Sequence, residues 1–128
     1  MEYNDKTKRF RFNDCKDKQC FKDALKKQNI EIHEYYDGIL EEFFECMSDV
    51  LMNILLNMFD YLLDEGYEFY IRIIRDPCSD EISIDFVVKL EDKSYESYVT
   101  TITKLNGYLK QISGKHRDAF CIGFDVRL

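Results

Sequence analysis

The segment from residue 28 to residue 71 contains no lysine or arginine and carries the longest helical pattern in the chain. Over residues 34–65, apolar residues recur every three or four positions, which predicts one long amphipathic helix that ends near Gly66. Because its apolar face is broad, the rest of the chain has to cover it. This face comprises Tyr36, Ile39, Leu40, Phe43, Met47, Val50, Leu51, Ile54, Leu55, Met58 and Leu62.

The opposite face of the predicted helix changes character half-way along. Its first half is a stripe of carboxylates that repel one another, because no lysine is interleaved with them. Its second half is an apolar patch that either residues 17–29 or a second copy of the chain must cover. The stripe is Glu34, Asp37, Glu41, Glu45 and Asp49, and the patch, a possible dimer interface, is Met52, Leu56, Phe59 and Leu63.

The remaining segments alternate between two kinds of pattern. A period of two over residues 67–74, 82–90 and 120–128 predicts three strands, the first two joined into a hairpin by a turn at residues 76–80. Residues 94–113 have helical spacing and predict a second helix. The competing interpretation of that segment is two strands, because Asn106 and Gly107 are typical of a hairpin turn.

Together these elements predict an α+β fold with the order helix-strand-strand-helix-strand, both helices packed on one face of a small antiparallel sheet. A first strand at residues 9–12 or 30–33 would give the ferredoxin-like order β-α-β-β-α-β. We expect a single domain over residues 1–128. Residues 1–29 would be a basic arm with a short helix, and residues 30–128 would contain the acidic helix and the α+β core.

The net charge of −7 is distributed unevenly, since residues 1–27 carry +4, residues 28–71 carry −11 and residues 72–128 carry zero. The chain begins without a signal-like apolar run, and residues 50–63 are too short and too polar for a membrane span. Five cysteines, an odd number, favour free thiols in the cytoplasm over a disulfide framework. Residues with AT-rich codons predominate, as in many bacteria and their phages.

Two groups of residues have side chains that could form a metal or catalytic site, but each is explained more simply by ordinary core, loop or surface positions. One has the ligand types of zinc but loose spacing: Cys15, Cys20, His33 and Cys46. The other pairs His116 with Cys78 or Cys121 as a thiol nucleophile, without any local motif. EF-hand and phosphate-loop patterns are also missing from the sequence. We therefore expect no catalytic residue, no metal and no cofactor.

The basic arm suggests nucleic-acid binding, because Lys8, Arg9 and Arg11 alternate with Phe10 and Phe12. The acidic segment that follows would repel the same polyanion. We expect instead that the arm packs beside the acidic helix and partly neutralises it, with no direct contact to nucleic acid or membrane.

The charge pattern favours a non-enzymatic protein-binding module that docks an acidic helix face on a basic partner protein. In charge and size the chain resembles small inhibitors such as nuclease immunity proteins and phage-encoded blockers of nucleic-acid enzymes. The alternatives are a merely solvated stripe, or a homodimeric regulatory domain that binds a small ligand. The hypothetical docking face is Glu34, Asp37, Glu41, Glu42, Glu45 and Asp49.

Overall fold

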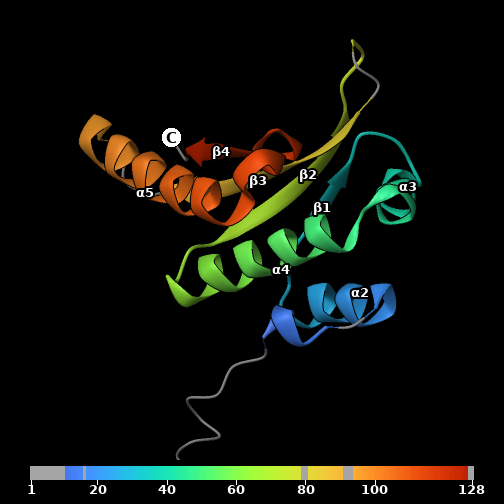
Figure 1. Ribbon diagram of the computed structural model, residues 1–128. Coiled ribbons are helices and arrows are strands. Elements are labelled where there is room, and N and C mark those ends of the chain that lie inside the picture. The colour runs from blue at the N-terminus through green and yellow to red at the C-terminus, as the bar shows by residue number, and fades with distance from the viewer. Residues whose placement is uncertain (1–10, 16, 79–80, 91–93, 127–128) are drawn as a thin grey trace, which may run out of the picture.

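The computed structural model describes residues 11–15, 17–78, 81–90 and 94–126 and has the expected α+β class (Figure 1). The 3₁₀ segments are η1 (Phe12–Asp14) and η2 (Gly114–Ala119). The helices are α2 (Lys18–Lys27), α3 (Ile39–Cys46), α4 (Asp49–Asp64) and α5 (Tyr95–Ser113). The strands are β1 (Ile32–Glu34), β2 (Phe69–Arg75), β3 (Ile82–Leu90) and β4 (Phe120–Val126).

The sheet is mixed, so the prediction of a purely antiparallel sheet is wrong. Its strand order is β1-β2-β3-β4, with β1 parallel to β2, β2 antiparallel to β3, and β3 parallel to β4. The order of elements along the chain is the predicted β-α-β-β-α-β, with α3 and α4 together forming the first helical connection. The spatial order of the strands differs from that of a ferredoxin-like sheet, because no strand lies between the two strands that each helical crossover connects. β1 overlaps the alternative at residues 30–33, whereas the alternative at residues 9–12 falls partly outside the described residues.

Both long helices cover one face of this sheet, as the sequence predicts. Phe59 of α4 lies 5.8 Å from Phe86 between ring centroids, and Tyr98 of α5 lies 5.1 Å from Phe124. The register pairs Phe86 with Ile122, two residues before Phe124, so both contacts are on the same face. The opposite face, with Tyr70 and Arg72, carries no helix in the described part of the chain (Figure 1).

This arrangement gives the two crossovers opposite hands. The connection from β1 to β2 and the connection from β3 to β4 both lead to the next strand in the same direction across the sheet. However, β1 and β2 run antiparallel to β3 and β4. With the helices of both units on one face, one crossover is right-handed and the other left-handed. Right-handed crossovers account for about 98% of such units, so one of these two belongs to the uncommon class.

The predicted helix over residues 34–65 is interrupted, and this is a correction. Met47 has an extended backbone, and the Ser48 hydroxyl accepts a hydrogen bond from the Leu51 N–H, which begins a separate helix, α4. The N-cap satisfies an amide that a continuous helix would have bonded internally. The second predicted helix is continuous: Leu105 and Leu109 of α5 are fully buried, and Asn106 and Gly107 lie within it.

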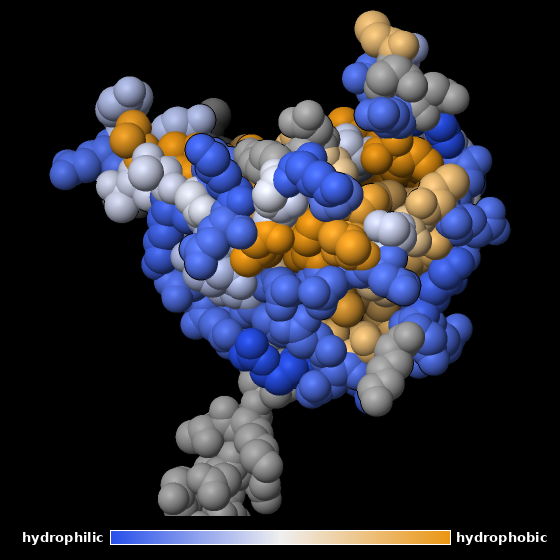
Figure 2. Space-filling model, viewed as in Figure 1, coloured by the Kyte–Doolittle hydropathy of each residue, from blue (hydrophilic) through white to orange (hydrophobic). Residues whose placement is uncertain are grey.

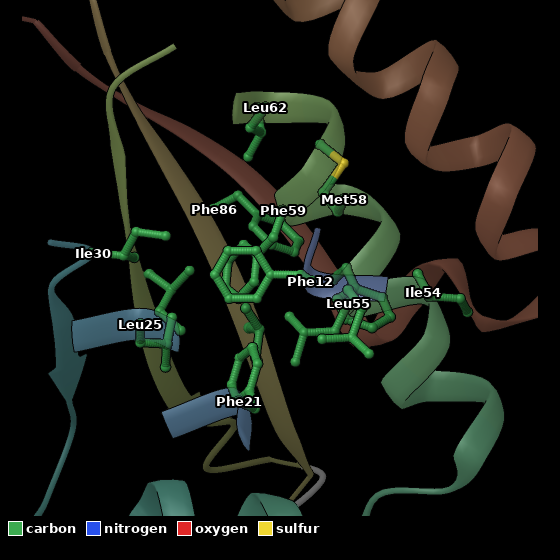
Figure 3. Packing of buried hydrophobic residues seen from close by; sticks show 14 of the residues in the cluster. Phe12, Phe21, Leu25, Ile30, Ile54, Leu55, Met58, Phe59, Leu62 and Phe86 are labelled. Carbon is green, nitrogen blue, oxygen red and sulfur yellow. The ribbon is translucent and has the colours of Figure 1, made fainter. Parts of the chain in front are cut away.

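The N-terminal segment, formed by η1 and α2, packs alongside α4 (Figure 1). The ring centroids of Phe12 and Phe21 lie 5.0 and 5.4 Å from that of Phe59, at the centre of the core (Figure 3). The apolar patch was expected to be covered either by residues 17–29 or by a second copy of the chain. In the structure, the N-terminal segment covers it. Leu56 is 4% exposed and Phe59 is fully buried, so they are not available for contact with a second copy.

The rest of the patch, Met52 and Leu63, is half-buried. Figure 2 shows a hydrophobic band at the surface along the junction of α4 and α5, surrounded by hydrophilic residues. No helix in the described part of the chain is both long and apolar enough to cross a membrane.

Candidate protein-docking site

The carboxylates of α4 that face η1 are neutralised by the N-terminal segment. Asp60, only 2% exposed, accepts the backbone N–H groups of Phe12 and Asn13 at 2.7 and 3.0 Å. Arg11 donates twice to Asp64, at 2.8 and 3.0 Å, and its Nε lies 3.7 Å from Asp60. The hydrogen bond to Asp64 is the main reason that the pKa of Arg11 is raised. From residue 11 onward, the basic arm therefore packs on the acidic helix, while Lys8, Arg9 and Phe10 fall outside the described residues.

Two acids of α3 also have cationic partners from distant parts of the sequence. Glu41 forms an ion pair with Lys22 of α2. Glu42 accepts a hydrogen bond from Arg75 of β2 at 2.7 Å and another from the Tyr36 hydroxyl. The bond from Tyr36, followed by that from Arg75, lowers the pKa of Glu42. These contacts remove Glu41 and Glu42 from the set of uncompensated charges.

The acids of the hypothetical docking face that are left form what we call the acidic end: Glu34, Asp37, Glu45 and Asp49. They lie at the end of β1, in the turn before α3, in the last turn of α3 and at the start of α4, so they gather at one end of the molecule (Figure 1). None of the four has an ion pair within the described residues. Glu34 accepts the Leu40 N–H at 2.9 Å and thereby helps to begin α3.

The acidic end also carries an aromatic residue that the sequence patterns did not single out. Tyr35 is 70% exposed, beside Tyr36, which is 37% exposed. The Tyr36 hydroxyl accepts from Arg75, at 3.0 and 3.1 Å, whereas the Tyr35 ring meets only that of Tyr36, at 6.1 Å between centroids, among its described ring contacts. Tyrosine is one of the residues that are enriched at protein interfaces and at their energetically important positions.

A surface cavity adjoins the acidic end at Asp49. It has a volume of about 550 Å³ and lies where α2 and α4 begin and α3 ends. Its lining combines three apolar side chains with two carboxylates and one lysine, and the apolar and acidic groups suit the aliphatic stem and charged head of lysine or arginine. The lining residues are Asp17, Lys18, Gln19, Phe44, Met47, Ser48, Asp49 and Met52.

The candidate zinc ligands do not come together as a set. Cys15 and Cys20 are in contact, with sulfur atoms 2.7 Å apart. His33 instead stacks on Tyr70 and bonds to Glu31 at 3.1 Å. No group of three or more potential metal ligands is present among the described residues.

The candidate thiol nucleophiles are not among the residues that line the cavity beside His116. Cys78 and Cys121 are exposed. His116 lines a cavity of about 590 Å³ with Cys46, Arg75 and Lys115, and neither Cys78 nor Cys121 is part of that lining. The structure therefore does not place these two thiols and His116 around a common cavity.

Comparisons of the chain with protein-family models, curated proteins and solved structures found no match. The functional argument therefore depends on the geometry of the acidic end.

Proposed function

We propose that the chain is a small non-enzymatic module that binds a partner protein, docking its acidic end on a basic surface of that partner. One observation carries the proposal. Acids of the same segment that lie against η1, α2, β2 and α5 have cationic partners, whereas the four acids of the acidic end have none among the described residues. Uncompensated carboxylates raise the association rate with a basic surface and can occupy the place of nucleic-acid phosphates.

The position of Glu45 supports a role in binding over a role in stability. It lies in the last turn of α3, where the helix dipole disfavours negative charge, and four residues after Glu41, whose charge repels it. The last turn of α3 contains no basic residue to offset these effects. A charge that opposes local stability is typical of a functional surface.

The chemistry of the partner follows from what surrounds the acids. Tyr35 offers a rigid aromatic contact, and the cavity beside Asp49 has room for one long basic side chain. A surface rich in arginine or lysine, such as the nucleic-acid-binding face of an enzyme, fits both features. An inhibitor of the immunity type is the form of this function that we favour. The alternative homodimeric ligand-binding domain has no such support, because Leu56 and Phe59 lie inside the chain's own core.

The test compares charge reversal at the acidic end with the same change elsewhere. The double variant Asp37→Lys with Glu45→Lys and the matched control Glu68→Lys with Glu96→Lys alter four exposed acids, two in each chain. Each purified chain is immobilised, and capture from an extract of the source cells is quantified by mass spectrometry at low and at high salt.

We expect at least one protein with a basic surface to be captured by the wild type and by the control. Its capture should fall about tenfold or more with the double variant and with high salt, because like charges then face each other. Capture that is the same for both variants would show that the acidic end is only a solvated surface.

A further inference from the structure

Two cysteines meet where η1 leads into α2. Cys15 directly follows η1, and Cys20 lies in the first turn of α2, where its N–H donates to the Asp17 carboxylate at 2.8 Å. Their sulfur atoms are 2.7 Å apart, which is within about 0.7 Å of the sulfur–sulfur distance in a disulfide, about 2.05 Å. The remaining cysteines, Cys46, Cys78 and Cys121, are exposed, and Cys46 lines a different cavity.

We propose that Cys15 and Cys20 are a reversible disulfide site that is oxidised by small-molecule disulfides of the glutathione type. This inference does not depend on the proposed docking function, since neither cysteine belongs to the acidic end. It concerns one local pair and is compatible with the expectation that the cysteines do not form a disulfide framework.

The reaction has two exchange steps. The Cys20 sulfur, deprotonated by solvent, attacks one sulfur of the small disulfide; a bond from Cys20 forms, the small disulfide breaks, and the first small thiolate leaves and takes up a proton. The Cys15 sulfur then loses its proton and attacks the Cys20 sulfur, which expels the second small thiolate. The two cysteines together lose two electrons and two protons, and the small disulfide gains both to become two thiols.

The surroundings of the two sulfurs assign this order. Cys20 is half-buried and reachable by an external disulfide, whereas Cys15 is only 8% exposed. Burial is the main reason that the pKa of Cys15 is raised to about 12, with the hydrogen bond to Cys20 as the next contribution. Cys15 therefore remains a protonated thiol until the mixed disulfide on Cys20 places an electrophilic sulfur beside it.

The disulfide would fasten η1 to α2, both of which pack against α4. In the sequence, Phe12 precedes Cys15 and Phe21 follows Cys20, and the rings of both phenylalanines contact Phe59. A covalent link between them restricts the unfolded chain and leaves the native contacts in place. The oxidised protein should accordingly melt at a higher temperature, on the order of 5 °C for a domain of this size.

The experiment equilibrates the full reduced chain in glutathione buffers of graded redox ratio, once folded and once in concentrated urea. Acid quenching and alkylation follow, and trypsin then separates the two cysteines by cleaving after Lys16 and Lys18. Disulfide formation is measured as the covalent joining of peptide 12–16 to peptide 19–22. We expect the equilibrium constant for oxidation to be about tenfold or more higher in the folded chain, because the fold holds the sulfurs together.

Two variants complete the design. Simultaneous replacement of Cys46, Cys78 and Cys121 by serine should leave the constant unchanged, and Cys20→Ser should abolish the joined peptides. A mixed disulfide that persists on Cys20, or equal constants in buffer and in urea, would overturn the proposal. The comparison of the constants in buffer and in urea uses the unaltered chain. It therefore tests the proposal even if Cys20→Ser does not fold.

Discussion

Acidic residues have different surroundings at the two ends of the acidic segment: they are bonded to other parts of the chain at one end and exposed at the other. At the covered end, which we define as η1, α2 and the part of α4 beneath them, Asp60 is 2% exposed and holds two backbone N–H groups. At the acidic end, Asp37, Glu45 and Asp49 are exposed and lack ion pairs among the described residues. The difference is the presence or absence of cations supplied from elsewhere in the sequence.

This comparison shows that the formal charge of a segment is not the charge of a surface. Residues 28–71 carry −11, yet Arg11, Lys22, Arg75 and Lys104 each form an ion pair with one or more of those acids. Four of the acids without an ion pair among the described residues, Glu34, Asp37, Glu45 and Asp49, lie around α3, and Glu68 lies apart from them. An acid at the covered end should therefore matter for stability, and one at the acidic end for binding.

The largest expected effect is the loss of the central aromatic ring of the covered end. Phe59→Ala removes a fully buried side chain that contacts Phe12, Phe21, Phe69 and Phe86, so it leaves a cavity. We expect the free energy of unfolding to fall by about 3–5 kcal/mol, measured by urea denaturation.

The matched truncation at the acidic end is Tyr35→Ala. Tyr35 is 70% exposed, so we expect its loss to change the free energy of unfolding by less than about 0.5 kcal/mol. Similar losses for the two variants would mean that the acidic end is part of the core and not a free surface.

The next effect concerns the buried carboxylate. Asp60→Asn keeps the size of the side chain but replaces one accepting oxygen by a donating NH₂ group, which then faces a backbone donor of η1. We expect a loss of about 2 kcal/mol in the same denaturation assay. The control is Asp49→Asn, where the exposed carboxylate should contribute no more than about 0.5 kcal/mol. If the order of the two losses were reversed, Asp60 would not be the anchor of η1.

The sequence predicts the elements of this fold better than their arrangement. The α+β class, the placement of both helices on one face and the continuous helix over residues 94–113 are confirmed, because hydrophobic periodicity reports which side of an element is buried. The order of strands and helices along the chain also holds, but the purely antiparallel sheet was wrong, because pairing between distant segments leaves no local pattern. The break at Ser48 was missed because apolar spacing continues through it, although Ser48 followed by Asp49 is a recognisable N-cap signal.

The candidate site was predictable only in part, for a related reason. The concentration of acids was visible along the chain, but Lys22 and Arg75, which neutralise Glu41 and Glu42, come from segments that are distant in sequence. Only the folded structure shows which carboxylates are compensated. The exposure of Tyr35 was equally hidden, because tyrosine is intermediate between the residues that are usually buried and those that are usually exposed.

A smaller expected effect is a pH dependence of stability that arises at the covered end, from Cys15, and not at the acidic end. Burial raises the pKa of Cys15 from 9.0 to about 12, so above about pH 9 the unfolded chain releases a proton that the folded chain retains. The stability contributed by the neutral thiol is therefore complete below pH 9 and is lost as the pH rises toward 12.

At about pH 10 this loss should be on the order of 1 kcal/mol, measured by urea denaturation of the reduced chain at several pH values. The difference between wild type and Cys15→Ala isolates it from the titration of lysines and tyrosines. Cys46→Ala, which removes an exposed thiol near the acidic end, should retain the wild-type pH dependence. A pH dependence that is unchanged in Cys15→Ala would show that this thiol does not titrate differently in the fold.

The smallest effect is the most direct test of the comparison, because its sign differs between two acids one helical turn apart. Glu41→Lys removes the pair with Lys22 and sets two cations side by side, so it should destabilise the fold by up to about 1 kcal/mol. Glu45→Lys places a cation in the last turn of α3, four residues after Glu41, so it should stabilise the fold by a few tenths of a kcal/mol. Paired urea denaturations at low and high salt measure both, and salt should shrink both effects. If Glu45→Lys is the more stable chain and also the one that loses its partner, the carboxylate at that position serves binding at the expense of stability. If it is destabilised like Glu41→Lys, Glu45 has a structural partner and the acidic end is smaller than we propose.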